Sequence, residues 1–177
     1  ACIGANRIYV QSSIHDEVGR RLADHARQMK VGEGSLPGVA MGPLVDMKAV
    51  EKVEELVGDA VRKGASVRAG GSRMQGEAYE KGSFYAPTVL TEVPRTARMH
   101  DEEIFGPVAA LYAFETEEQA VELANDVPYG LSAYIFTENM DRAIRVGERL
   151  ETGMVGINEI RLGAAEAPFG GGKMSGI

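Results

Sequence analysis

Two long segments carry apolar residues at the three-to-four-residue spacing of an amphipathic helix. The first is predicted over residues 13–30 and the second over residues 46–64. Ser13 is the expected N-cap of the first helix, because its hydroxyl can accept a hydrogen bond from the first turn. Asp46 is the expected N-cap of the second, and Gly64 is its natural C-terminal stop.

Shorter runs rich in β-branched and aromatic residues lie between and after these helices and predict strands. Residues 108–114 are continuously apolar, which is typical of a buried strand. The other strands are expected over residues 6–11, 66–70, 84–93, 131–136 and 154–157. A capping box at Thr116 opens a helix through Ala124, and a further helix is predicted over 140–150. The glycine-rich tail from 164 to 177 is expected to be irregular.

Strands that alternate with helices indicate βαβ units. The predicted fold class is therefore α/β, with a mainly parallel twisted sheet flanked by helices. The chain of 177 residues fits one domain and shows no internal repeat or obvious linker. Gly is over-represented, with 22 residues, and the glycines are not periodic, which favours a turn-rich α/β architecture.

Composition excludes several classes of function. The net charge of -7 lacks the basic footprint of nucleic-acid binding, and no apolar stretch is long enough to span a membrane. The single Cys forms no internal disulfide and no cysteine-based zinc site, so no metal is expected. A lone Cys and no visible secretory signal favour a reducing, cytoplasmic location.

Cys2 is the only thiol, and its residue type alone leaves two interpretations open. A lone Cys is commonly a small buried hydrophobe, and it is less often a nucleophile. His15, His25 and His100 lie far from Cys2 in the sequence, so no neighbour is seen that activates the thiol.

The acidic run that begins at Asp101 abuts an aromatic turn and leads into the apolar segment 108–114. Three consecutive acids are commonly a solvated face. Here a carboxylate held at the entrance of a strand is also placed to accept hydrogen bonds from ligand hydroxyls.

The segment from Pro168 to Gly176 invites a phosphate-loop interpretation because of its glycines. It lacks the Walker spacing, and no helical pattern follows it. A tight backbone turn that lets another segment approach closely is the favoured interpretation.

Several short motifs occur together and in a fixed order. They are Ala1 to Arg7 around Cys2, Gly42 to Leu44, Glu102 to Pro107, Asn125 to Leu131, Gly156 to Asn158 and Pro168 to Gly171. In this order they resemble the C-terminal, catalytic part of the NAD(P)-dependent aldehyde dehydrogenase superfamily. The chain as a whole is similar to the succinate-semialdehyde dehydrogenases of that superfamily.

The resemblance implies a role for each matching residue. Cys2 is implied to be the nucleophile that attacks the aldehyde carbonyl, with hydride passing to NAD or NADP and water releasing the acid. Glu103 is implied to bind the nicotinamide ribose hydroxyls, and Phe105 to pack near the nicotinamide. Phe169 is implied to line the substrate pocket. Arg161 lies in the substrate-loop segment, where it either binds a substrate carboxylate or is a solvated surface residue.

The resemblance also implies what residues 1–177 lack. The chain is expected to be an aldehyde dehydrogenase catalytic-domain fragment, with the cofactor-binding domain, the general-base Glu, the side-chain oxyanion Asn and the C-terminal oligomerisation strand outside it. The parent is expected to be a homo-oligomer acting on a small-molecule aldehyde, and the isolated chain to be inactive. The alternative is a non-catalytic fragment or pseudoenzyme that retains only packing or assembly surfaces.

Overall fold

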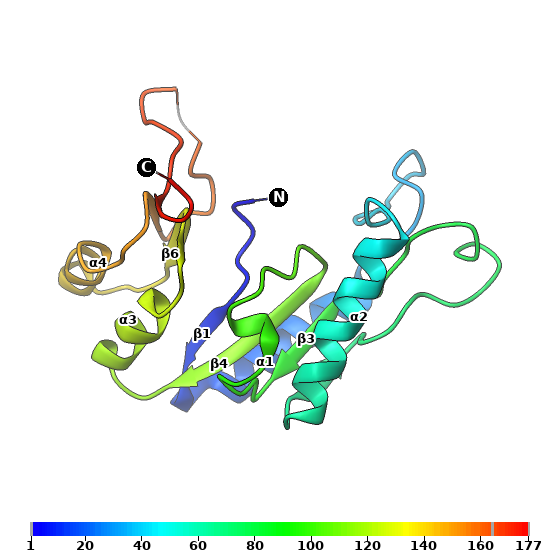
Figure 1. The fold of residues 1–177 in the computed structure, drawn as a ribbon, viewed down its shortest axis with the longest axis horizontal. Coiled ribbons are helices and arrows are strands. Elements are labelled where there is room, and N and C mark those ends of the chain that lie inside the picture. Colours follow the sequence, from blue (N-terminus) through cyan, green and yellow to red (C-terminus); the bar gives the residue numbers. More distant parts are fainter. Residues whose placement is uncertain (1, 164, 177) are drawn as a thin grey trace. The chain divides into compact units, whose positions relative to one another are not determined.

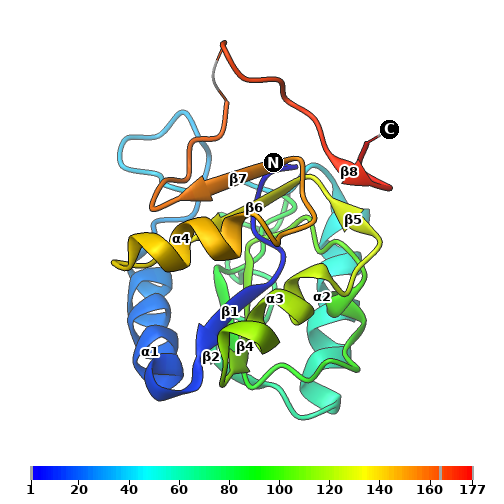
Figure 2. The same ribbon diagram turned by 90° about the vertical axis from the view of Figure 1, so that its left-hand side faces the viewer.

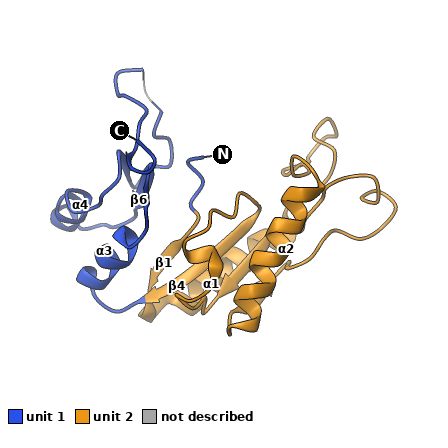
Figure 3. Ribbon diagram, viewed as in Figure 1, with its two compact units in different colours: residues 1–5, 114–177 blue, residues 6–113 orange. Residues whose placement is uncertain are grey.

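The computed structural model describes residues 2–163 and 165–176. Residue 1, which belongs to the cysteine motif, and residues 164 and 177 of the tail lie outside the described residues. The chain divides into two compact units (Figure 3). One unit consists of residues 6–113, and the other combines residues 1–5 with 114–177.

The unit of residues 6–113 is built on a four-stranded sheet with the order β1-β4-β3-β2. Its strands are β1 (Ile8–Gln11), β2 (Ser66–Ala69), β3 (Thr88–Thr91) and β4 (Val108–Phe114). Strands β3 and β4 are parallel, with Val89 opposite Ala109, whereas β2 joins β3 in antiparallel fashion at the edge. Strand β4 matches its predicted bounds, and β3 is a short part of the extended segment predicted over 84–93.

Two helices cover the two faces of this sheet, α1 (Ser12–Gln28) and α2 (Met47–Arg62) (Figure 1). Val89 and Leu111 pack in one apolar cluster with residues of α1, whereas Leu90 and Ala110 pack in another with residues of α2. Since consecutive residues of a strand point to opposite faces, the sheet lies between the two helices.

The ends of α1 and α2 can be compared with the predicted capping residues. Asp46 accepts a hydrogen bond from the backbone N–H of Ala49 at 2.8 Å, and Gly64 has a φ of 115° just after α2. Both predictions are confirmed. The prediction that Ser13 caps the first helix is wrong. Strand β1 runs to Gln11 and α1 begins at the next residue, so no connecting residue is left to serve as a side-chain cap.

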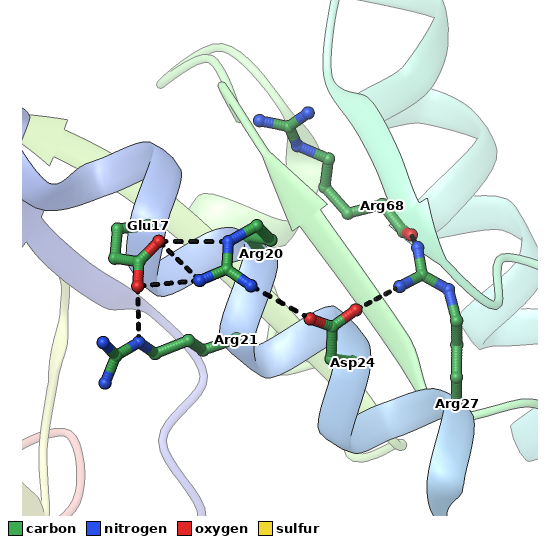
Figure 4. Close-up of polar contacts among 6 residues, drawn as sticks. All are labelled: Glu17, Arg20, Arg21, Asp24, Arg27 and Arg68. Carbon is green, nitrogen blue, oxygen red and sulfur yellow. Dashed lines mark hydrogen bonds and ion pairs between the residues drawn. The ribbon is translucent and has the colours of Figure 1, made fainter.

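The exposed face of α1 is covered by ion pairs (Figure 4). Glu17 accepts hydrogen bonds from Arg20 and Arg21, and Asp24 pairs with Arg20 and Arg27. The guanidinium groups of Arg20 and Arg21 hold the pKa of the Glu17 carboxyl below its ordinary value. Because all these side chains are largely exposed, each pair adds little to stability. This charged face of α1 is therefore a solvated surface.

The second unit contains a βαβ arrangement in which β6 and β7 are parallel and α4 packs against both strands (Figure 2). Its elements are α3 (Glu117–Asn125), β5 (Tyr129–Gly130), β6 (Ser132–Ile135), α4 (Met140–Gly147), β7 (Met154–Ile157) and β8 (Gly172–Lys173). The predicted cap at Thr116 is confirmed, because its hydroxyl accepts the N–H of Gln119 at 3.2 Å, while the Gln119 side chain reaches back to the N–H of Glu115 at 2.7 Å rather than to that of Thr116. The tail is not wholly irregular, since β8 pairs with β5.

The predicted α/β class is thus confirmed, with parallel pairs β3–β4 and β6–β7 and helices beside both. The remaining element of the first unit is a short 3-10 turn, η1 (Arg98–His100), which leads into the acidic run. In the described part of the chain, no helix is both long and apolar enough to cross a membrane. The same residues hold no cluster of three or more His, Cys, Asp or Glu side chains able to bind a metal ion.

Candidate functional site

The loop of residues 101–107, between η1 and β4, presents two of the predicted residues to solvent. Ile104 is only 2% exposed and anchors the loop in the apolar cluster beneath α2. Glu103 and Phe105, on either side of Ile104, are both exposed, and Phe105 is 55% exposed. Phe105 also has a φ of 51°, a left-handed conformation that is uncommon for a bulky side chain. A strained, exposed aromatic residue of this kind is typical of functional sites.

The three consecutive acids of this loop have different partners. Asp101 lies 2.8 Å from Nδ1 of the buried His100, and Glu102 pairs with Arg98 at 2.7 Å. This pairing with Arg98 holds the pKa of the Glu102 carboxyl below its ordinary value. Among residues 2–163 and 165–176, no hydrogen bond or ion pair engages the Glu103 carboxylate. Of the acidic run, Glu103 is therefore the carboxylate available to a ligand.

The start of the loop is fixed by Asp59 of α2. Its carboxylate accepts the backbone N–H of Arg98 at 2.8 Å and an N–H of Lys63 at 3.0 Å. The backbone N–H of Arg98, followed by the Lys63 ammonium, lowers the pKa of Asp59 from its ordinary value. Asp59 thereby ties the turn η1 to the helix α2 in its charged form.

The end of the loop is fixed by close packing and a backbone hydrogen bond. Gly106 packs directly against the side chain of Val53 of α2, where a Cβ atom has no room. The carbonyl of Pro107 accepts the N–H of Thr88 at 2.8 Å, which joins the loop to the start of β3.

The middle of the loop is held by Asn6, which lies two residues before β1. Its side-chain oxygen accepts the N–H of Ile104 at 2.8 Å. Its amide nitrogen donates to the carbonyls of Met99 at 3.0 Å and Glu102 at 3.4 Å. Sequence reasoning did not single out Asn6 for a role. The available signal was a polar amide side chain close to the start of an apolar strand.

Cys2 belongs to the other unit, where its thiol is exposed. The interpretation of Cys2 as a buried hydrophobe is therefore wrong for the described chain. The segment that carries it is attached to β6, because the hydroxyl of Tyr134 donates to the carbonyl of Ile3 at 2.7 Å. An exposed thiol on a tethered segment is open to an electrophile.

Arg161 and Phe169 lie in the same unit as Cys2, on the segment after β7. The carboxylate of Glu159 accepts the backbone N–H groups of Ile160 at 2.7 Å and Arg161 at 2.8 Å, which shapes a turn there. In the described part of the chain, the guanidinium of Arg161 has no hydrogen-bond or ion-pair partner, and it is exposed. Phe169 is 58% exposed.

The glycine-rich segment 168–176 forms the tight, closely packed turn that the sequence predicts. Gly171 packs against Ser175, and Gly153 packs against the backbone of Gly170, with no room for a Cβ at either position. The ammonium of Lys173 is already engaged, because it donates to two backbone carbonyls and pairs with Glu151 at 2.6 Å. These contacts leave no cationic cradle for a phosphate at this segment.

Two hollows lie elsewhere in the unit of residues 6–113. One, of about 200 Å³, is lined in part by Arg73, Tyr79 and Phe84. The other, of about 500 Å³, lies between α2 and β2 beside Val61 and Val67. Neither is lined by a predicted site residue.

Comparison with known proteins identifies the family of the chain. The model of the aldehyde dehydrogenase family matches residues 1–177. The chain is 48% identical over 176 residues to a probable NADP(+)-dependent succinate-semialdehyde dehydrogenase of Sinorhizobium fredii, covering 99% of this chain and 35% of that protein. It is 44% identical to a glutarate-semialdehyde dehydrogenase of Pseudomonas putida, over 99% of this chain and 35% of that protein.

A solved structure gives the same result for the fold. The crystal structure of betaine aldehyde dehydrogenase from Staphylococcus aureus in complex with NAD+ superposes with a TM-score of 0.95 at 38% identity, covering all of this chain and 35% of that one. The chain therefore belongs to the aldehyde dehydrogenase family. It spans about a third of the length of the relatives it matches.

Proposed function

We propose that this chain supplies the catalytic part of an enzyme that oxidises an aldehyde to a carboxylic acid with NAD or NADP. The observation that carries the proposal is the loop of residues 101–107. Within the described residues, the Glu103 carboxylate has no hydrogen-bond or ion-pair partner and Phe105 is exposed, whereas Asp101 and Glu102 pair with neighbouring side chains. A carboxylate with two free acceptor oxygens suits a pair of ribose hydroxyls, and an exposed ring suits a flat heterocycle. Family membership supports the same roles.

In the proposed mechanism, the Cys2 thiolate attacks the aldehyde carbon and forms a thiohemiacetal. The backbone N–H of Cys2 donates to the oxyanion that develops on the carbonyl oxygen. When bound, NAD(P) supplies the hydride acceptor for this oxidation. Loss of hydride from this oxyanion leaves a thioester on Cys2, and a water molecule hydrolyses it to the acid and the free thiol. Glu103 and Phe105 orient the cofactor, and Phe169 lines the substrate site.

We further propose that residues 1–177 correspond to the C-terminal, catalytic portion of a longer enzyme. The relatives are about three times as long as this chain. The resemblance puts the cofactor-binding domain, the general base and the oligomerisation strand in the part that this chain does not span. The enzyme proposed is a homo-oligomer, and a reducing, cytoplasmic setting suits an enzyme in which Cys2 must remain a thiol.

The 177-residue chain alone is expected to show no aldehyde-dependent formation of NAD(P)H. The reason is that it contains neither the implied general base nor most of the implied cofactor domain. The same assay on an enzyme of the relatives' length that contains this chain is expected to show turnover with succinate semialdehyde. Inactivity of that longer enzyme, with a free Cys2 thiol confirmed by iodoacetamide labelling, would instead support a pseudoenzyme.

The aldehyde proposed for this enzyme carries a carboxylate, as succinate semialdehyde does. Support comes from the exposed Arg161, whose guanidinium has no partner among residues 2–163 and 165–176 and matches a carboxylate in geometry. Two of the relatives are named for semialdehydes of dicarboxylic acids.

Arg161→Ala is expected to raise KM for succinate semialdehyde by about tenfold or more, because it removes a charge-assisted contact. It is expected to leave KM for butanal, which lacks the carboxylate, unchanged. Arg149→Ala is the matched control, since Arg149 is another exposed arginine of the same unit. Equal effects of Arg161→Ala on both aldehydes would show that Arg161 is a solvated surface residue.

A further inference from the structure

Asn6 joins two segments that are far apart in the sequence. The residues it contacts are 93 to 98 positions further along the chain. Its side chain is both an acceptor and a donor. The amide oxygen accepts the N–H of Ile104, and the amide nitrogen donates to the carbonyls of Met99 and Glu102. One half-buried amide thus satisfies three backbone groups of the segment that precedes and includes the loop.

Of these three contacts, the hydrogen bond to Ile104 indicates what Asn6 does. Ile104 lies between Glu103 and Phe105, the two exposed residues proposed to meet the cofactor, and its own side chain is buried. Asn6 therefore fixes the backbone at the midpoint between the two proposed cofactor contacts. The next residue, Phe105, has a φ of 51°, and such a conformation persists only where the surroundings over-determine it.

Two other hydrogen bonds hold the backbone on either side of this loop's centre. Asp59 holds the backbone of Arg98, before the acidic run, and Thr88 holds the carbonyl of Pro107, after it. In the described part of the chain, the side-chain hydrogen bond to Ile104 comes from Asn6. Loss of Asn6 therefore leaves the ends of the loop and the buried Ile104 side chain in place, but it removes the hydrogen bond that fixes the backbone between Glu103 and Phe105.

We propose that Asn6 is a positioning residue for the cofactor. It sets the separation and direction of Glu103 and Phe105 through the hydrogen bond to Ile104, without touching the cofactor itself. This inference rests on the proposed function, because it assigns Asn6 a part in the same dehydrogenase site. It also places the anchor of the cofactor loop four residues after the proposed nucleophile in the sequence.

The test compares Asn6→Ala with Asn125→Ala in an enzyme of the relatives' length that contains this chain. Asn125 is a matched control in the other unit. Its amide donates to the carbonyl of Arg149 at 2.8 Å and accepts the N–H of Glu151 at 2.9 Å, so it also bridges two backbone segments. Asn6→Ala is expected to raise KM for NAD(P) by about tenfold, with a smaller change in kcat. Asn125→Ala is expected to affect thermal unfolding but not KM for NAD(P).

A second variant, Asn6→Asp, keeps an oxygen that can accept the N–H of Ile104 but loses the donor to Met99 and Glu102. It is expected to keep KM for NAD(P) within about threefold of the unsubstituted enzyme. Hydrogen exchange on the 177-residue chain reports the same contact directly, because the Ile104 amide should exchange faster in Asn6→Ala than in Asn6→Asp. If Asn6→Ala does not fold, the KM of Asn6→Asp for NAD(P) tests the role of Asn6. A protected Ile104 amide with a tenfold higher KM would then overturn the proposal.

The outcomes separate this inference from the proposed function. An active enzyme in which Asn6→Ala leaves KM for NAD(P) unchanged, or changes it no more than Asn125→Ala does, overturns the role of Asn6 alone. An unsubstituted enzyme that is inactive toward every aldehyde overturns the proposed function, and the role of Asn6 falls with it.

Discussion

Cys2→Ala is expected to lower kcat for aldehyde oxidation on the order of 10⁴-fold in an enzyme of the relatives' length that contains this chain. Alanine keeps the backbone N–H of residue 2, which is proposed to donate to the oxyanion. It removes the sulfur on which both the thiohemiacetal and the thioester form, so the covalent route is lost. The thiol is exposed, so the substitution leaves no cavity in a core and is expected to change stability by less than about 0.5 kcal/mol.

Two measurements make the Cys2 result specific. Binding of NADPH, followed by its fluorescence, is expected to be retained, because Glu103 and Phe105 are unchanged. Met140→Ala is the matched control, since it removes an exposed sulfur from the same unit, where Met140 is 70% exposed. It is expected to leave kcat unaltered. If Cys2→Ala kept more than about a tenth of the activity, Cys2 would not be the nucleophile and the proposed mechanism would be wrong.

The parts of the fold that the sequence predicted well are those decided by short-range contacts. The strand predicted over 154–157 is β7 residue for residue, and the strand predicted over 108–114 is β4. Asp46 caps α2 through Ala49, three residues away, and such a cap can be read from a local pattern. The Ser13 cap failed because β1 and α1 join without a connecting residue, and only the sheet register fixes that junction.

Long-range contacts explain what could not be predicted. Strand β8 exists because Gly172 pairs with Gly130, and no local periodicity signals a two-residue strand in a glycine-rich tail. The glycine turn itself was expected, but the segment that approaches it, around Gly153, was not identified.

The candidate site shows the same division. Its residue types could be proposed from sequence, since Glu103 and Phe105 lie in a motif that resembles a known one. The distinction between Glu103 and its acidic neighbours needed the structure, because it depends on the partners that Asp101 and Glu102 find in space. The role inferred for Asn6 depends on contacts across more than ninety residues, which no local pattern reveals.

At the end of β2, Gly70→Ala is expected to lower the free energy of unfolding of the chain by about 3 kcal/mol. Part of this loss is conformational, because Gly70 has a φ of 68°, where alanine is disfavoured by roughly 1 kcal/mol. The larger part is steric. A Cβ at Gly70 would lie 2.6 Å from Oγ1 of Thr88 and 2.9 Å from the carbonyl carbon of Pro87, and it would approach the Pro87 oxygen more closely still.

Little around Gly70 can move to relieve these contacts. Thr88 is 2% exposed, and its hydroxyl both accepts the N–H of Gly71 and donates to the carbonyl of Ala86, each at 2.8 Å. The backbone N–H of Thr88 donates to the carbonyl of Pro107 at the end of the 101–107 loop. Any shift of Thr88 therefore strains the β2–β3 pairing and the loop together. Faster hydrogen exchange of the Thr88 amide in Gly70→Ala would report that strain.

Gly38→Ala separates the two parts of this loss. Gly38 has a φ of 76°, close to that of Gly70, but nothing lies within 4 Å of the position its Cβ would take. It is therefore expected to cost only the conformational part, about 1 kcal/mol. Urea denaturation of both variants measures the difference, which we expect to be about 2 kcal/mol. Equal losses would mean that the Pro87–Thr88 backbone yields freely, and that the end of the cofactor loop is not held rigidly against β2.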